Sequence, residues 1–143
     1  MKRFLTIVTI ILSLILVLSA CNRRRPGEVG PPAPLDAVPD ILGTYVVNGF
    51  DPLGVEYSGH LTILPGENSD TYEFQWIVNG SIQKGNGRLE GNILQAEWRN
   101  VDDGLDQSQG TATYTVTADG ILDGIRLVKD HEGEGTETAY PNQ

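Results

Sequence analysis

The chain contains a single cysteine, Cys21, among its 143 residues. No disulfide can form within the chain, so its stability has to come from the packing of a core. Basic residues are scarce after the first quarter of the sequence: from Asp40 to Gln143, seventeen acidic residues stand against five basic ones. Nucleic-acid affinity comes mostly from lysine and arginine that neutralise phosphates, so we expect no nucleic-acid partner. The excess of negative charge is itself typical of proteins that rely on net charge to remain soluble.

Residues suited to catalysis are also few. His60 and His131 are the only histidines, and His60 alternates with Ser58 and Thr62 on a polar face. No G-x-S-x-G motif occurs, and the glycine-rich stretch 85–91 lacks the lysine and the following helix of a phosphate-binding loop. We therefore expect a chain without catalytic residues or a cofactor, and not an enzyme.

Two acidic stretches carry oxygen ligands of the kind that calcium prefers. One holds Asp102, Asp103 and Asp106, and the other holds Asp130, His131, Glu132, Glu134 and Glu137. Neither follows the Asp-x-Asp-x-Asp-Gly pattern of a calcium loop, so solvated loops explain both and we predict no metal site. The first stretch is the better calcium candidate, because its long loop can wrap around an ion.

The one long hydrophobic run lies at the N-terminus. Residues 4–18 are mostly apolar, follow Lys2 and Arg3, and end in Leu18-Ser19-Ala20-Cys21. A basic start, an apolar middle and small residues at the end are typical of an export signal. An uncleaved membrane helix is an alternative, although the run is short of the roughly 20 residues that a span needs. A conventional cleaved signal peptide is the other.

The tetrapeptide Leu18-Ser19-Ala20-Cys21 resembles the lipobox of bacterial lipoproteins at all four positions. The resemblance implies cleavage before Cys21, a diacylglycerol on its sulfur, and acylation of the new amino terminus, for example by palmitate. It places the protein in the bacterial cell envelope, lipid-anchored to the membrane and extracytoplasmic. Asn22 is not the aspartate that retains lipoproteins at the inner membrane in enteric bacteria, so in a host with two membranes the outer one is expected.

A linker follows the cysteine. Three arginines (residues 23–25) suit either lipid headgroups or a solvated tether. Residues 26–39 contain five prolines and no periodic apolar pattern, which predicts a disordered, semi-extended spacer. The expected organisation is a signal peptide over 1–20, a lipidated cysteine and linker over 21–39, and a folded domain over 40–143.

From Ile41 onward the apolar residues alternate with polar ones, which predicts strands and no helix. Asn79-Gly80 and Asp119-Gly120 predict type I′ hairpins, and short connections make neighbouring strands antiparallel. One apolar face runs through the strands and includes Ile125 and Leu127, so the simplest fold is an all-β, eight-stranded antiparallel up-and-down barrel. A sandwich is the alternative. The predicted strands are Gly43–Phe50, Val55–Leu64, Thr71–Val78, Ser81–Leu89, Asn92–Asn100, Thr111–Thr117, Ile121–Lys129 and Gly133–Tyr140.

Aromatic residues dominate the expected inner face. A barrel of eight strands is just wide enough to be filled by side chains or to hold one small ligand, and the sequence leaves both possibilities open. The residues predicted to contact a ligand in the lumen are Tyr45, Tyr57, Tyr72, Trp76, Trp98 and Tyr114.

Glycines, aromatics and turn residues recur with a characteristic spacing. The pattern comprises G-x-Y from Gly43, D-P-x-G-x-x-Y-x-G from Asp51, a tryptophan strand, G-x-G from Gly85 and D-G-x-L-x-G from Asp119. It resembles small exported bacterial barrel proteins with a lipocalin- or avidin-like fold, some of them described as fibronectin-binding. The resemblance implies a non-catalytic barrel that binds a protein or matrix partner. The alternatives are a carrier of a small molecule in the lumen, or a structural envelope lipoprotein without a ligand.

Overall fold

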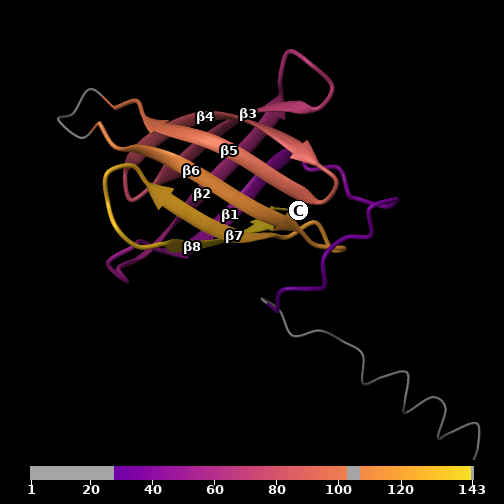
Figure 1. Ribbon diagram of the computed structural model, residues 1–143, viewed down its shortest axis with the longest axis horizontal. Helices are drawn as coiled ribbons and strands as arrows, with labels where there is room; N and C mark the ends of the chain where they lie inside the picture. Colours follow the sequence, from indigo (N-terminus) through magenta and orange to yellow (C-terminus); the bar gives the residue numbers. More distant parts are fainter. Residues whose placement is uncertain (1–27, 103–106, 143) are drawn as a thin grey trace, which may run out of the picture.

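A computed structural model describes residues 28–102 and 107–142 of the chain (Figure 1). The predicted signal peptide and Cys21 lie outside these residues, as do Asp103 and Asp106 of the first acidic stretch. Within the described residues, no helix is long and apolar enough to cross a membrane.

Eight strands follow one another in sequence, and each pairs antiparallel with the next. The last strand pairs with the first, from Tyr45 opposite Pro141 to Phe50 opposite Thr136, so the sheet closes into a barrel. The predicted all-β up-and-down barrel is therefore confirmed, and the predicted strand ends are correct to within two residues. The strands are β1 (Gly43–Phe50), β2 (Glu56–Pro65), β3 (Thr71–Val78), β4 (Ser81–Glu90), β5 (Ile93–Asn100), β6 (Gln109–Val116), β7 (Leu122–Val128) and β8 (Gly135–Pro141).

Two hairpin turns that look alike in sequence differ in structure. Asn79 and Gly80 both have positive φ, 51° and 77°, and join β3 to β4 in the predicted type I′ turn. Between β6 and β7 only Gly120 has a positive φ, 78°, and Val116 pairs with Leu122. A two-residue turn at Asp119-Gly120 would instead have paired Val116 with the next residue along. The predicted type I′ turn at this place is therefore wrong.

This longer turn reverses the facing of β7, because a shift of one residue moves every side chain to the other side of the sheet. Arg126 points into the barrel and is 6% exposed, whereas Ile125 and Leu127 point outward and are 37% and 40% exposed. The expectation that Ile125 and Leu127 belong to the inner face is wrong for this reason.

The two ends of the barrel differ. At one end, shown on the right in Figure 1, the chain enters the barrel beside the β6–β7 turn. The Ala33 amide donates to the Val116 carbonyl (2.8 Å), the Ala118 amide donates to the Pro31 carbonyl (3.0 Å), and the Asn92 side chain donates to the Ala33 carbonyl (2.8 Å). Part of the predicted linker is thus bound to the barrel. We refer to this end as the closed end.

Side chains fill the lumen near the closed end. Ile41 and Ala33 are almost fully buried there, and Ile41 belongs to the hydrophobic core that lines the inner face. The Phe74 and Trp76 rings stack with their centroids 5.3 Å apart. The fully buried core around them includes Val47, Leu61, Ile63, Leu94, Tyr114, Val116 and Leu122.

Candidate functional site

A buried carboxylate lies at the middle of the lumen. Glu137 of β8 points inward and is 1% exposed. Its oxygens accept hydrogen bonds from the Trp76 indole (3.0 Å), the Tyr57 hydroxyl (2.7 Å), the Tyr114 hydroxyl and the Arg126 guanidinium (2.9 Å). Burying a carboxylate is very unfavourable unless it is paired and hydrogen-bonded. Four donors from four strands meet that requirement for Glu137.

Arg126 completes the network from the neighbouring strand. It pairs in register with Gly135 and so stands diagonally beside Glu137 on the inner face. Its second terminal nitrogen donates to the Gln83 side-chain oxygen (2.7 Å). The guanidinium carbon lies 4.4 Å from the Trp98 ring centroid and 5.2 Å from that of Trp76, which adds cation–π attraction.

The ionisation of these groups follows from burial and from the two opposite charges. Burial raises the pKa of Tyr57 and of Tyr114, and the negative Glu137 raises both further, while Arg126 partly opposes the shift. Burial alone would lower the pKa of Arg126, but the attraction of Glu137 outweighs it and the pKa is raised. The network therefore contains neutral tyrosines and a permanently cationic arginine beside the carboxylate.

An open cavity of about 560 Å³ lies above this network, at the end of the barrel opposite the closed end. Its polar floor consists of Arg126, Gln83 and the Tyr57 hydroxyl, and Trp98 forms one wall. The lumen is therefore packed at one end and hollow at the other. Side chains fill only the closed end, and only the opposite end has room for a small ligand. We call this space the mouth cavity.

The β1–β2 hairpin forms part of the cavity rim. The Asp51 carboxylate accepts hydrogen bonds from the amides of Leu53 (2.9 Å) and Val55 (2.8 Å), which hold the hairpin in one shape. Phe50 and Leu53 line the cavity at its entrance, yet they remain 48% and 83% exposed. The rim thus presents apolar side chains to solvent on a loop that is closed by hydrogen bonds.

The six residues predicted to contact a ligand divide between the two halves of the lumen. Tyr57 and Trp98 line the mouth cavity. Trp76 and Tyr114 lie beneath it, bonded to Glu137. Tyr45 is buried toward the closed end, where its hydroxyl donates to the Ile41 carbonyl (2.8 Å), and Tyr72 is only partly buried beside the core. Contact with a ligand remains a prediction for all six.

Sequence reasoning missed the charged centre of the site. The sequence pattern groups Glu137 with Asp130 and Glu132 in one acidic stretch, whereas in the structure Glu137 lies on β8 with its side chain inside the barrel. The signal was present in the alternation Gly135-Glu137-Ala139, where small residues flank the glutamate on the same face. Recognising it required the register of β7 against β8, which brings Arg126 alongside.

Asp102, the one aspartate of the first acidic stretch among the described residues, has a local structural role. The Asp102 carboxylate accepts hydrogen bonds from the Ser81 hydroxyl and the Ile82 amide, both at 2.9 Å, and so fixes the start of β4. Across residues 28–102 and 107–142, no cluster of three or more histidine, cysteine, aspartate or glutamate side chains is placed to hold a metal ion. His60 is exposed, as predicted.

Comparison with known proteins identifies the fold and nothing finer. No protein-family model matches the chain, and no curated protein matches it. Among solved structures, a redesigned β-barrel superposes with a TM-score of 0.60 at 15% identity, covering 72% of this chain and 92% of that one. A de novo designed fluorescence-activating β-barrel superposes with a TM-score of 0.54 at 16% identity, over 71% and 93% of the two chains. A redesigned barrel, mFAP1, bound to DFHBI, gives 0.54 at 19% identity, over 70% and 94%.

Proposed function

We propose that this protein is a lipid-anchored envelope protein whose barrel binds one small molecule in the mouth cavity, without catalysis. The observation that carries the proposal is the cavity itself, about 560 Å³ above a hydrogen-bonded floor. Ligand sites usually occupy 300–1,000 Å³, with mostly apolar walls and a few placed polar groups. Designed barrels with this fold, among them one bound to DFHBI, support a binding role for such a lumen.

The lining favours a flat, neutral and largely apolar ligand. Arg126 and Glu137 neutralise each other, so the floor does not require a charge on the ligand. Trp98 and Tyr57 offer aromatic surface on the walls, and Phe50 offers more at the entrance. A flat ring system would bury the most area against such walls.

The proposed lipid anchor would orient the barrel with its mouth cavity away from the membrane. A lipid on Cys21 would tether the chain from the side at which it enters the barrel, and that is the closed end (Figure 1). The mouth cavity would then open away from the membrane, toward the aqueous side of the envelope. Replacement of Cys21 by alanine is expected to release the protein from the membrane fraction. Unchanged membrane attachment would contradict the lipid anchor.

The ligand proposal can be tested with Nile red, a neutral, flat dye whose emission rises in apolar surroundings. Val128 lies inside the barrel and lines the cavity, so Val128→Phe is expected to reduce dye binding by filling the space. The matched control is Ile125→Phe on the same strand, which adds the same ring to the outer face. Equal binding by both variants and the parent would count against the cavity as the site.

A second candidate function is binding of a protein or matrix partner at the rim. The observation that favours it is the exposed apolar set Phe50, Leu53 and Val55 on the ordered β1–β2 hairpin, with 48%, 83% and 57% of each residue exposed. Binding to immobilised fibronectin should then fall when Leu53 is replaced by aspartate. If the parent protein does not bind the coated surface above background, this candidate fails for that partner, while the dye experiment is unaffected.

A further inference from the structure

A row of basic side chains crosses the outer face of the barrel near the open end. Lys84 of β4 pairs in register with Arg99 of β5, and Arg99 pairs with Gln109 of β6. The Lys129 amide, just beyond β7, donates to the Gln109 carbonyl (2.7 Å). These residues line a surface groove of about 660 Å³, together with the Thr111 side chain. We call it the basic groove.

The distribution of charge makes this row unusual for such an acidic domain. Between Asp40 and Gln143 there are only five basic residues; Arg126 is buried, and three of the other four line the basic groove. Arg88, the fourth, is paired with Asp70 at 3.1 Å. Among the described residues, no ion pair reaches the three groove cations.

The position of the cations is unfavourable for the isolated barrel. Lys84 and Arg99 are directly opposite each other on the neighbouring strands β4 and β5, and like charges in such a cross-strand pair repel each other. Glu97 is the one carboxylate among the described residues that line the groove. Asp102 is not among the residues that line the groove, and its carboxylate accepts hydrogen bonds from the Ser81 hydroxyl and the Ile82 amide. Among the described residues that line the groove, three cations are therefore accompanied by a single carboxylate.

We propose that the basic groove binds a soluble polyanion that carries several phosphate or sulfate groups. Arginine binds such oxyanions through its planar fork, and lysine binds them as a point charge. The row from Lys84 to Lys129 crosses three strand spacings, about 14 Å in all, which suits an extended chain of charges better than a single ion. The basic groove adjoins the mouth cavity, since Trp98, Val128 and His131 line both, but its three cations do not line the mouth cavity. Anion binding in the groove therefore does not depend on a ligand in the mouth cavity.

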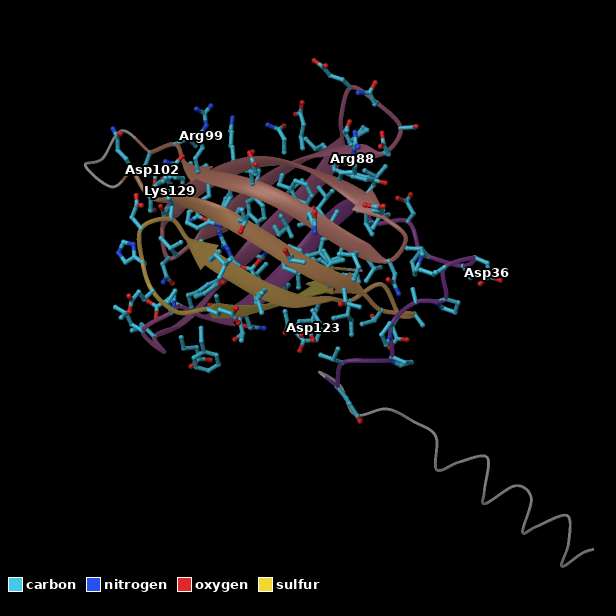
Figure 2. The ribbon with its side chains drawn as sticks, viewed as in Figure 1. Asp36, Arg88, Arg99, Asp102, Asp123 and Lys129 are labelled. Carbon is cyan, nitrogen blue, oxygen red and sulfur yellow. The ribbon has the colours of Figure 1, made fainter. Side chains whose placement is uncertain are left out.

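The choice of a soluble ligand follows from the location of the groove. It lies at the open end of the barrel, whereas the chain enters at the closed end, and Figure 2 shows Arg99 and Lys129 at the opposite end of the barrel from Asp36 of the entering segment. A chain tethered through its N-terminus would hold these cations away from the headgroups of its own membrane. This step rests on the proposed anchor, but anion binding by the groove does not.

Calorimetry on the purified full chain, with tripolyphosphate and separately with a trisulfated disaccharide, tests the site. Binding of at least one probe is expected, and it should weaken as salt increases. Each of Lys84→Gln, Arg99→Gln and Lys129→Gln should reduce affinity by roughly two- to fivefold, and the triple variant should not bind measurably. Glu97→Gln should strengthen binding, since it removes a carboxylate that competes with the anion for the groove cations. The two probes distinguish a phosphate-bearing from a sulfate-bearing ligand.

The matched control is Arg88→Gln, which removes an exposed basic residue of the same strand outside the groove and should leave affinity unchanged. An equal loss in Arg88→Gln, full binding by the triple variant, or no binding of either probe would overturn the proposal. Lys84→Gln should not lower the midpoint of thermal unfolding, because it relieves a repulsion; a lowered midpoint would assign Lys84 a structural role instead. Binding to phosphatidylglycerol vesicles but to neither soluble probe would overturn the choice of a soluble ligand.

Discussion

Arg126 and Glu137 form a salt bridge inside the barrel, with the guanidinium nitrogen 2.9 Å from the carboxylate oxygen and both side chains almost fully buried. The pair joins β7 to β8, and its other hydrogen-bond partners, Tyr57, Trp76, Gln83 and Tyr114, come from β2, β3, β4 and β6. Polar contacts thus bind together strands from around the closed sheet at the level where the packed core gives way to the mouth cavity. The floor of the proposed ligand site is therefore also a structural joint.

Glu137→Gln should be strongly destabilising. It leaves Arg126 charged and buried without its counter-ion, and breaking a buried pair in this way costs about 3–5 kcal/mol. Urea unfolding followed by tryptophan fluorescence would measure the loss. Glu134→Gln, an exposed change on the adjacent loop, is the control and should stay within about 0.5 kcal/mol of the parent. A small effect at Glu137 would show that the charge on Arg126 is solvated by water or compensated by another side chain.

Stability should also fall in strong alkali. Burial raises the pKa of Tyr45 to about 12, and it raises the pKa of Tyr57 and Tyr114 from the ordinary value near 10. Above pH 10 the unfolded chain loses protons that the folded chain retains, so this stabilisation is complete below pH 10 and disappears as pH rises through the folded values.

The slope is about 1.4 kcal/mol per pH unit for each tyrosine that titrates only on unfolding. Tyr114→Phe removes one such group and should make the decline shallower by about that amount. Unfolding free energies measured between pH 9 and 12 test this prediction, with tyrosinate absorbance as the second signal. An unchanged slope in Tyr114→Phe would mean that Tyr114 ionises in the folded protein.

The order and limits of the strands could be predicted from sequence because they depend on local chemistry. Alternating side chains define a strand with one buried face, and Asn79-Gly80 supplies the two positive φ values of a type I′ turn. Closure of the barrel follows because an isolated sheet of this kind would leave two edges unpaired. The strands and turns depend on neighbours in the chain, and closure pairs β1 with β8 without requiring any particular side-chain contact.

The centre of the site could not be predicted in the same way. The facing of β7 depends on one extra residue in the β6–β7 turn, which pairs Val116 with Leu122. Hydropathy alone favours Ile125 and Leu127 as inner residues over Arg126, and only the partners of Arg126 on other strands make its burial favourable. Sequence patterns do not contain that information, because Gln83, Arg126 and Glu137 come from three separate strands.

Gly110→Ala should disturb the wall of the mouth cavity. Gly110 pairs in register with Trp98, and a methyl group there would lie 1.8 Å from the Leu127 carbonyl oxygen and 3.0 Å from the Trp98 ring. Backbone and ring both have to move, at a cost of about 1–3 kcal/mol. We expect lower stability, a shifted tryptophan emission and weaker dye binding. Thr111→Ala, its outward-facing neighbour, should change none of the three, and a similar change there would point to a general loosening of β6.

The segment that precedes β1 should contribute to stability, although it was expected to be a spacer. Ala33 is 2% exposed, and its amide and carbonyl bond to Val116 and to Asn92. Ala33→Asp would bury a charge in this contact, so the segment should detach and its hydrogen bonds should be lost. At about 0.5–1.5 kcal/mol for each bond, we expect a loss of about 1–3 kcal/mol.

Ala37→Asp is the matched control, since Ala37 lies in the same segment with its side chain exposed, and it should leave stability unchanged. Hydrogen exchange supplies a local measurement: the Ala118 amide, which donates to the Pro31 carbonyl, should exchange faster in Ala33→Asp but not in Ala37→Asp. Equal exchange in both variants would mean that the segment does not cover the β6–β7 turn in solution. In that case the free tether would extend to the start of β1, and the barrel would be held farther from any membrane anchor.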